Sequence, residues 1–304
     1  MTDFLPIYTD SYSEPKREQA LGIWRLNQET MVQLYVSKPI IQLDGRTMRT
    51  ALSDVYQLIE EDIDLREYEI GVGQYYPRMA IGRMQEGFNA ATEYCDVWPV
   101  DTDARSMALA QYHLLHSRLE AILRVVQPNE ENLNSFGHEI RDLLILACTA
   151  VEGQFKGILR ANEYAFALNN RGEIRASTND YVKTLAPMKL DSYEFVLTIE
   201  PSAPSFTPFG NWDCGAPTES LDWYTAYNAV KHDWEAEFSR ATLSHAISAV
   251  TACRALHEAQ FLQASEVMNH GTLFAGVAKP TWSHHEKYWP PIDGKWQPRR
   301  FSFS

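Results

Sequence analysis

Cysteine is scarce in this sequence. The 304 residues contain four cysteines, Cys95, Cys148, Cys214 and Cys253, and none of them forms a Cys-x-x-Cys pair. The spacing of a zinc knuckle is therefore missing, and we expect a reduced chain without a disulfide framework. The first residues carry no basic region followed by an apolar run, so the sequence predicts no secretory leader and a cytoplasmic location.

Long hydrophobic runs and the common cofactor motifs are also missing. The most apolar stretch, residues 143–151, is far shorter than the roughly 20 residues that span a bilayer, so we expect no membrane partner. There is no P-loop and no serine nucleophile elbow, and residues 71–73 (GVG) lack the rest of a dinucleotide fingerprint, so we predict no cofactor. His113, His116 and Glu120 share one helical face, but no second helix is known to supply a carboxylate, and we predict no metal.

Positive charge is in deficit. The chain has 27 Lys and Arg against 40 Asp and Glu, a net charge of −13. This excess argues against coating of nucleic acid through bulk charge, although it leaves room for a local basic site. The last residues, 287–304, are locally basic and contain Trp289 and Trp296. Such a segment either stacks on single-stranded nucleic acid or docks on the acidic body of its own chain.

Helical periodicity is what the sequence has in abundance. It predicts helices over residues 13–26, 51–63, 77–94, 104–126, 136–165, 178–186, 220–234 and 241–268. Alternation predicts extended segments at 32–36 and 192–199, and the Asp44-Gly45 turn is able to close a hairpin. The predicted fold class is mostly α, with a C-terminal helical bundle preceded by an N-terminal helical region that carries a candidate small β-hairpin.

The polar segment 127–134 (QPNEENLN) divides the predicted helices into two groups. We therefore predict an N-terminal helical region over 1–127, a helical bundle over 128–270 and a Trp- and Pro-rich tail over 271–304. Within the bundle, prolines forbid regular helix through 200–218. The same segment contains Phe206, Phe209 and Trp212, so we expect an ordered loop pinned by its aromatic side chains.

The stretch Trp223–Glu235 (WYTAYNAVKHDWE) has the densest polar chemistry of the chain. Asn228 and His232 are one helical turn apart and share a face, while Lys231 points about 100° away. The histidine is expected at a helix C-terminus, where the macrodipole favours the imidazolium. The stretch is therefore either a working site or a well-capped helix end in which Asn228 bonds a neighbouring loop.

Residues 130–270 resemble the HEPN superfamily of helical domains, and the likeness rests on this stretch. The family signature is Arg, a polar residue that is often Asn, three variable residues and His, at the end of the helix before the last one. Residues 227–232 (YNAVKH) have Asn228 and His232 at the matching positions. Glu152 and Lys156 in the earlier long helix correspond to a charged pair that some of these families carry.

The departure from the signature is Tyr227, which stands where the family has Arg. In the family's metal-independent ribonucleases the His helps the ribose 2′-hydroxyl attack the adjacent phosphate, and the Arg holds that phosphate. A tyrosine hydroxyl carries no charge to replace a bidentate Arg. Lys231 and Arg240 are the candidates for a replacement from another direction.

The resemblance implies two functions. The first is a non-catalytic or degenerate HEPN-like helical protein that acts in RNA-associated or protein–protein interaction. The alternative is a metal-independent ribonuclease that uses His232 and Asn228, with Lys231 as a further catalytic residue, in a site formed across a homodimer. In both, the binding residues implied are Tyr227, Glu152, Lys156 and Arg240.

Overall fold

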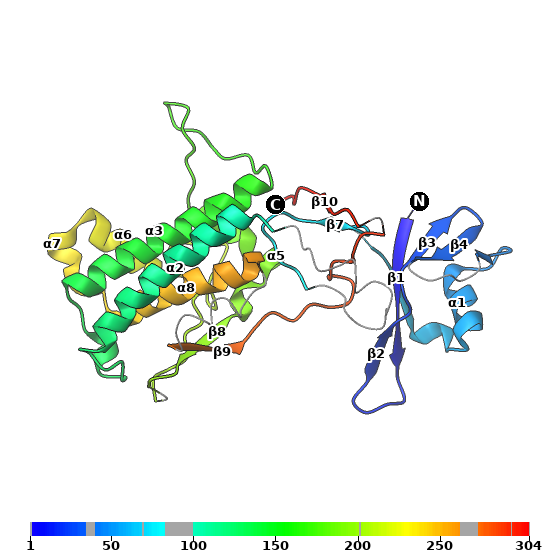
Figure 1. Cartoon of the computed structure of the whole chain (residues 1–304), viewed down its shortest axis with the longest axis horizontal. Coiled ribbons are helices and arrows are strands. Elements are labelled where there is room, and N and C mark those ends of the chain that lie inside the picture. The colour runs from blue at the N-terminus through cyan, green and yellow to red at the C-terminus, as the bar shows by residue number, and fades with distance from the viewer. Residues whose placement is uncertain are drawn as a thin grey trace. The chain divides into compact units, whose positions relative to one another are not determined.

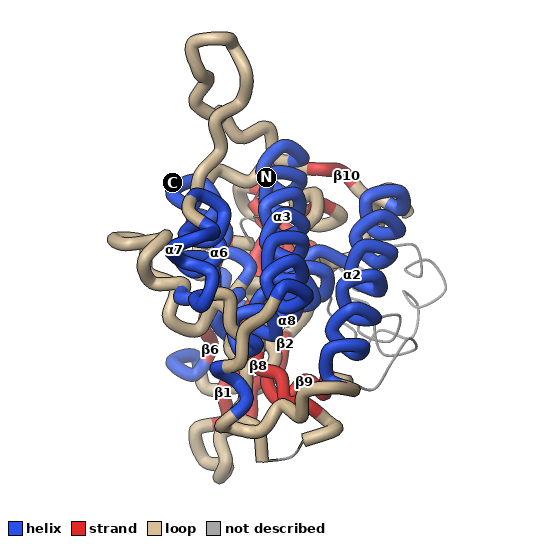
Figure 2. The backbone as a smooth tube through the Cα atoms, turned by 90° about the vertical axis from the view of Figure 1, so that its left-hand side faces the viewer, coloured by secondary structure: helices blue, strands red, loops and turns tan. Residues whose placement is uncertain are grey.

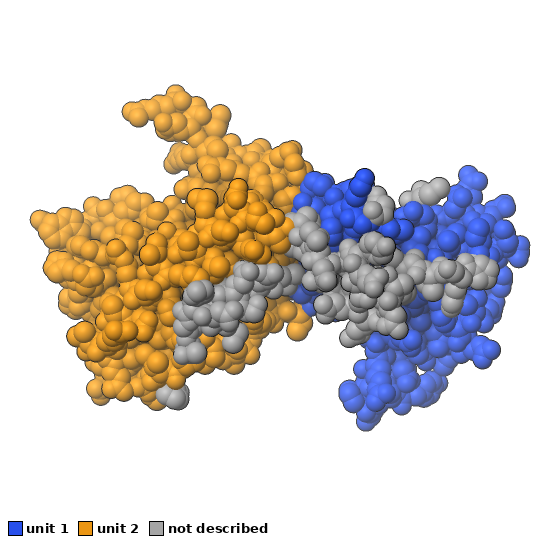
Figure 3. All heavy atoms as spheres, viewed as in Figure 1, with its two compact units in different colours: residues 1–75, 81–99, 282–299 blue, residues 76–80, 100–281, 300–304 orange. Residues whose placement is uncertain are grey.

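The chain divides into two compact units (Figure 3). The computed structural model describes residues 2–34, 40–68, 70–82, 100–200, 202–261, 273–292 and 294–303. Unit 1 comprises residues 1–75, 81–99 and 282–299, and unit 2 comprises residues 76–80, 100–281 and 300–304. Each unit has an apolar core of its own.

Unit 1 is built on an antiparallel sheet. Its strands are β1 (Thr2–Asp10), β2 (Arg17–Ala20), β3 (Trp24–Asn27), β4 (Thr30–Gln33), β5 (Ile41–Gln42) and β6 (Ile63–Glu67). Hydrogen-bonded neighbours follow the order β2-β1-β3-β4-β5, and β6 also pairs with β1, through residues 4–8 of that strand. The predicted mostly α fold, with a helical N-terminal region and only a small hairpin, is therefore wrong (Figure 1).

The predicted helix over 13–26 is replaced by β2 and β3. Gly22 lies between them with φ +86°, a left-handed conformation that a helix excludes and that glycine tolerates. The Trp24 side chain is fully buried, and its indole Nε1 donates to the Leu21 carbonyl over 3.0 Å. Helix α1 (Met48–Tyr56) buries Met48, Ala51 and Leu52 in the same core.

The predicted hairpin around Asp44 and Gly45 is also corrected. Both residues have positive φ, but their turn leads from β5 into α1, and β5 pairs back with β4. Of the helix predicted over 77–94, residues 77–82 are described and lie outside any helix, and residues 83–94 are outside the described residues. The short strands β7 (Gln74–Tyr75) and β10 (Gln297–Pro298) pair in parallel.

Unit 2 contains the long helices. They are α2 (Thr102–Leu123), α3 (His138–Ala161), α6 (Asp222–His232) and α8 (Leu243–Phe261), with the shorter α4 (Thr178–Tyr181), α5 (Leu185–Met188) and α7 (Trp234–Glu237). Helix α3 packs against α2, α6 and α8 (Figures 1 and 2). Strand β8 (Glu194–Leu197) pairs with β9 (Phe274–Ala278). The long helices predicted from periodicity are thus present, with residues 262–268 outside the described residues.

The core of unit 2 surrounds α8, which is buried along most of its length. The proline-rich loop contributes to the same core, because Phe206, Phe209 and Trp212 are all buried. The Trp212 indole donates to the Pro217 carbonyl, and the Trp223 indole donates to the Pro208 carbonyl, each over 2.8 Å. None of the helices in the described part of the chain combines the length and apolar character of a membrane span.

Candidate functional site

The candidate site lies at the C-terminal half of α6. This helix has Asp222 in its first turn and Lys231 and His232 in its last turn, which complements the helix dipole. His232 is the last helical residue, and the following Asp233 caps α7 by accepting from the Ala236 amide over 3.2 Å. Helix α6 therefore ends at His232, and α7 begins two residues later at Trp234.

Tyr227 and Lys231 form one contact pair on α6. The Tyr227 side chain is 2% exposed, and the Lys231 ammonium donates to its hydroxyl over 2.9 Å. The ammonium also lies 4.8 Å from the ring centre. Burial raises the pKa of Tyr227, and the hydrogen bond to Tyr227 raises the pKa of Lys231. The phenol therefore stays neutral and the ammonium stays charged at pH 7.

Glu152 on α3 faces the same helix. Its Oε1 accepts from the Tyr224 hydroxyl over 2.9 Å, and its Oε2 lies 3.4 Å from the Lys156 ammonium. Burial raises the pKa of Tyr224 and of Tyr181, and the negative charge of Glu152 raises both further. Glu152 therefore lies in a layer of neutral phenols, with Tyr224 from α6 and Tyr181 from α4, and Lys156 is its counter-charge.

Asn228, His232 and Arg240 lie apart from that layer. Asn228 is half-buried and His232 is exposed, and within the described residues neither side chain has a hydrogen-bond partner. Arg240 ends the short 3₁₀ turn Phe238–Arg240 and pairs with Glu237 over 3.3 Å. The structure thus brings Glu152, Lys156, Tyr227 and Lys231 into one neighbourhood and leaves the signature histidine in solvent.

The surroundings of His232 are acidic. Asp233 and Glu235 follow it and are exposed, as is the apolar ring of Trp234, at 56%. Carboxylates beside an imidazole repel a phosphate and attract a cationic partner.

The described residues contain no group of three or more His, Cys, Asp or Glu side chains that could hold a metal ion. His116 is buried and packs against Tyr112 and Phe274, whereas Glu120 is on the surface and pairs with Arg124 over 3.1 Å. Helical spacing predicted that His116 and Glu120 share one face of α2, but in the structure His116 lies in the core and Glu120 lies at the surface.

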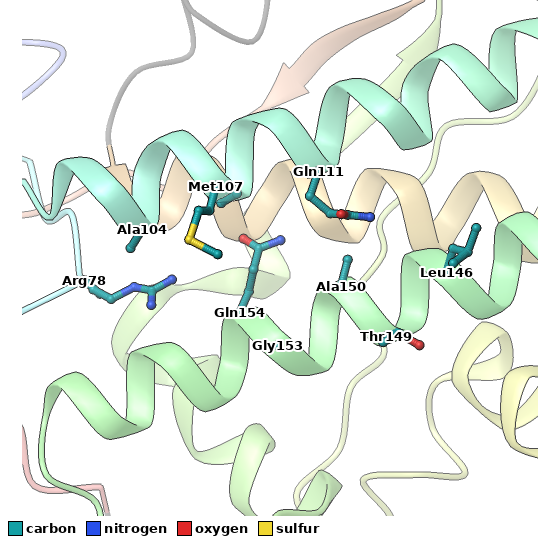
Figure 4. Close-up of a pocket in the computed structure, with 10 residues that line it drawn as sticks. Arg78, Ala104, Met107, Gln111, Leu146, Thr149, Ala150, Gly153 and Gln154 are labelled. Atoms are coloured by element: carbon teal, nitrogen blue, oxygen red, sulfur yellow. The ribbon is translucent and has the colours of Figure 1, made fainter.

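A pocket between α2 and α3, with Arg78 among the residues that line it, could not be predicted from the sequence (Figure 4). Residues 77–94 read as one amphipathic helix, which would have placed Arg78 at a helix start and not beside α3. No local motif marks this arginine, because the pocket forms only through contacts between distant parts of unit 2.

Comparison of the chain with family models, with curated proteins and with solved structures gave no match.

Proposed function

We propose that unit 2 is a degenerate HEPN-like module that acts in protein–protein interaction and does not cleave RNA. The observation that carries the proposal is the contact between Lys231 and Tyr227. The position that holds the phosphate-binding Arg in the family signature is here a buried neutral ring, and the nearest lysine on α6 points at that ring. Without a cation aimed at the scissile phosphate, rate losses on the order of 100-fold or more are expected.

The corner formed by His232, Asp233, Trp234 and Glu235 is the surface that supports an interaction role. It combines an exposed indole with carboxylates, and aromatic anchors of this kind dominate the energetics of protein interfaces. The resemblance implies a second copy of the chain as the partner, since signature residues of the family face each other across a dimer. The acidic side chains make RNA the less favoured partner.

The alternative, a metal-independent ribonuclease, keeps one observation in its favour. His232 is exposed at the end of α6, one turn after the half-buried Asn228, so both are on the face that a substrate would approach. In such a site two copies of His232 would face each other, and one could act as the base while the other acts as the acid.

The two functions are separated by one experiment on the full chain. RNA cleavage is measured in EDTA for the wild type and His232→Ala. The mass in solution is measured by sedimentation for these two proteins and for Trp234→Glu. We expect no cleavage by either protein, a dimer for the wild type and a weakened dimer for Trp234→Glu. Cleavage by the wild type that is lost in an equally folded His232→Ala variant would overturn the non-catalytic proposal. A wild-type monomer at all concentrations tested would overturn the homodimer.

A further inference from the structure

A pocket of about 510 Å³ opens between α2 and α3 (Figure 4). This volume lies within the roughly 300–1,000 Å³ that is typical of small-molecule sites. Most of its wall is apolar and comes from both helices: Ala104, Met107, Ala108, Leu146 and Ala150. Arg78 is the charged residue among those that line it. An occupant with an apolar body and one negative charge would match this wall.

The backbone of Arg78 is held in an unusual conformation. Its φ is +57°, a left-handed value that costs a non-glycine residue roughly 1–3 kcal/mol. Hydrogen bonds on both sides keep it there: the Asn162 amide donates to the Pro77 carbonyl over 2.9 Å, and the Ala80 amide donates to the Ala259 carbonyl over 2.8 Å. These bonds hold the backbone before and after Arg78, and they therefore fix the direction in which its side chain leaves the chain.

The guanidinium of Arg78 is oriented but not neutralised. Its Nε donates to Gln260 Oε1 over 2.8 Å, and its Cζ lies 5.6 Å from the centre of the Phe261 ring. A Cβ added to Gly157 would overlap Nη1 and lie 2.7 Å from Cζ, so the guanidinium rests against α3 at Gly157, where the helix has no side chain. No hydrogen bond or ion pair joins either Nη group to an acceptor among the described residues.

Charge near Arg78 is only partly balanced. Burial lowers the pKa of Arg78, and the Asp101 carboxylate opposes this from beyond ion-pair distance. That carboxylate is already engaged, because it caps α2 by accepting from the Ala104 amide over 3.0 Å. A half-buried cation with open donors is stabilised by an anion that brings its own charge into the pocket.

We propose that the pocket between α2 and α3 binds a small carboxylate with an unbranched apolar body, with the carboxylate on the open Nη groups of Arg78 and the body along Met107, Ala150 and Leu146. The planar fork of a guanidinium matches a carboxylate, and one cation balances one negative charge. From Leu146 to Gln154 the pocket follows α3 for roughly 12 Å, which suits an extended chain. Gln154 belongs to the wall, since its amide is already bonded to Gln260 over 2.9 Å.

The test is isothermal titration calorimetry on the full chain with decanoate, below its micellar concentration. Decanol is the control that has the same alkyl chain and no charge, and inorganic phosphate is the control that has negative charge and no alkyl chain. We expect saturable binding of one decanoate per chain, binding of decanol weaker by at least about tenfold, and no heat from phosphate. The variant Arg78→Gln should weaken decanoate by at least about tenfold and leave decanol unchanged.

Two glycines of α3 give a matched pair of variants. Gly157→Ala displaces the guanidinium, whereas Gly153→Ala places its methyl where nothing lies within 4 Å. Both changes favour the helix, so circular dichroism should show each variant folded. We expect Gly157→Ala to weaken decanoate by at least about tenfold and to leave decanol unchanged, whereas Gly153→Ala, on the pocket wall and away from the guanidinium, should change decanoate and decanol by the same factor.

Several outcomes would overturn the proposal. No saturable decanoate binding by the wild type below about 1 mM would remove the site altogether. Equal affinities for decanoate and decanol, or a decanoate affinity that neither Arg78→Gln nor Gly157→Ala changes, would leave an apolar groove without an anion site. Phosphate bound as tightly as decanoate would rule out the apolar body.

Discussion

The ammonium of Lys231 lies 2.9 Å from the hydroxyl of Tyr227, one turn earlier on α6, and 4.8 Å from the centre of its ring. The contact makes Tyr227 both the packing anchor of α6 and the acceptor for its last-turn cation. Tyr227 is therefore a structural residue, because its ring occupies a site where a charged guanidinium would have to be buried.

Substitutions at Tyr227 separate its two roles. Tyr227→Phe keeps the ring and removes the hydrogen bond, so we expect a loss of about 1 kcal/mol of unfolding free energy. Tyr227→Ala also removes the ring from the core, and we expect a loss of roughly 3–5 kcal/mol. Urea unfolding followed by circular dichroism measures both. Equal losses for the two variants would show that the hydroxyl, and not the ring, holds α6 in place.

The helices of unit 2 could be predicted from the sequence because their apolar spacing is regular over many turns, as in α3 and α6. The position of His232 at a helix end followed from the start of the next helix, and the structure agrees. The aromatic anchors of the proline-rich loop could also be predicted, since Phe209 and Trp212 would be out of place in a solvated linker.

The sheet of unit 1 could not be predicted in the same way. Its strands are short, and β2 and β3, which both pair with β1, are separated by Gly22 with its positive φ. The partners of β1 are also distant in sequence, since β6 begins at Ile63. Arg78 was missed for a related reason: its neighbours Gly157 and Gln260 come from α3 and α8. Contacts of this range leave no local pattern.

Arg254 and Glu258 form a buried ion pair on α8, and we expect strong energetic coupling between them. They are 3% and 5% exposed, and their Nε and Oε1 atoms are 2.9 Å apart. Arg254 also donates to the Phe274 carbonyl of β9 over 2.8 Å, and Lys279 lies 3.0 Å from the second oxygen of Glu258. Arg254→Leu leaves Glu258 with only the half-exposed Lys279, so we expect a loss of roughly 3–5 kcal/mol.

The double variant Arg254→Leu with Glu258→Leu is the control for that prediction. It removes both buried charges, and we expect it to be less destabilised than Arg254→Leu alone. A double-mutant cycle by urea unfolding gives the coupling directly. Additive losses would mean that the pair contributes nothing beyond the packing of its two side chains.

Gly22 and Gly45 provide a comparison within unit 1, since both have positive φ. A Cβ at position 22 would overlap Gln33 Nε2 and lie 3.3 Å from Gln33 Cδ, whereas at position 45 nothing lies within 4 Å. Gln33 is buried, and its Nε2 donates to the Leu21 carbonyl over 3.1 Å. We expect Gly22→Ala to lower the free energy of unfolding by roughly 2–3 kcal/mol, from backbone strain together with the lost Gln33 contact. Gly45→Ala should lower it by about 1 kcal/mol, from backbone strain alone. Thermal unfolding of both variants tests this, and equal shifts would contradict a role for the Gln33 contact.

His257 makes the stability of unit 2 depend on pH. Its ring is fully buried on α8, and among the described residues neither ring nitrogen has a hydrogen-bond partner. Burial lowers the pKa of His257 from its ordinary value of 6.5 to about 4; the Glu258 carboxylate opposes the shift, and Arg105 and His113 add to it. The folded chain therefore excludes a proton that the unfolded chain binds between these two pH values.

The sign of the pH effect follows from that difference. The contribution of His257 to stability is complete above pH 6.5 and is lost as the pH falls to about 4. Over this window the loss should reach roughly 3 kcal/mol. His257→Leu removes the titrating ring and keeps an apolar side chain in the core, so its stability should fall less over the same window.

The measurement is urea unfolding of both proteins from pH 4 to pH 7. The difference between the two curves isolates His257, because the other titrating groups are shared. Parallel curves would show that the buried ring keeps an ordinary pKa.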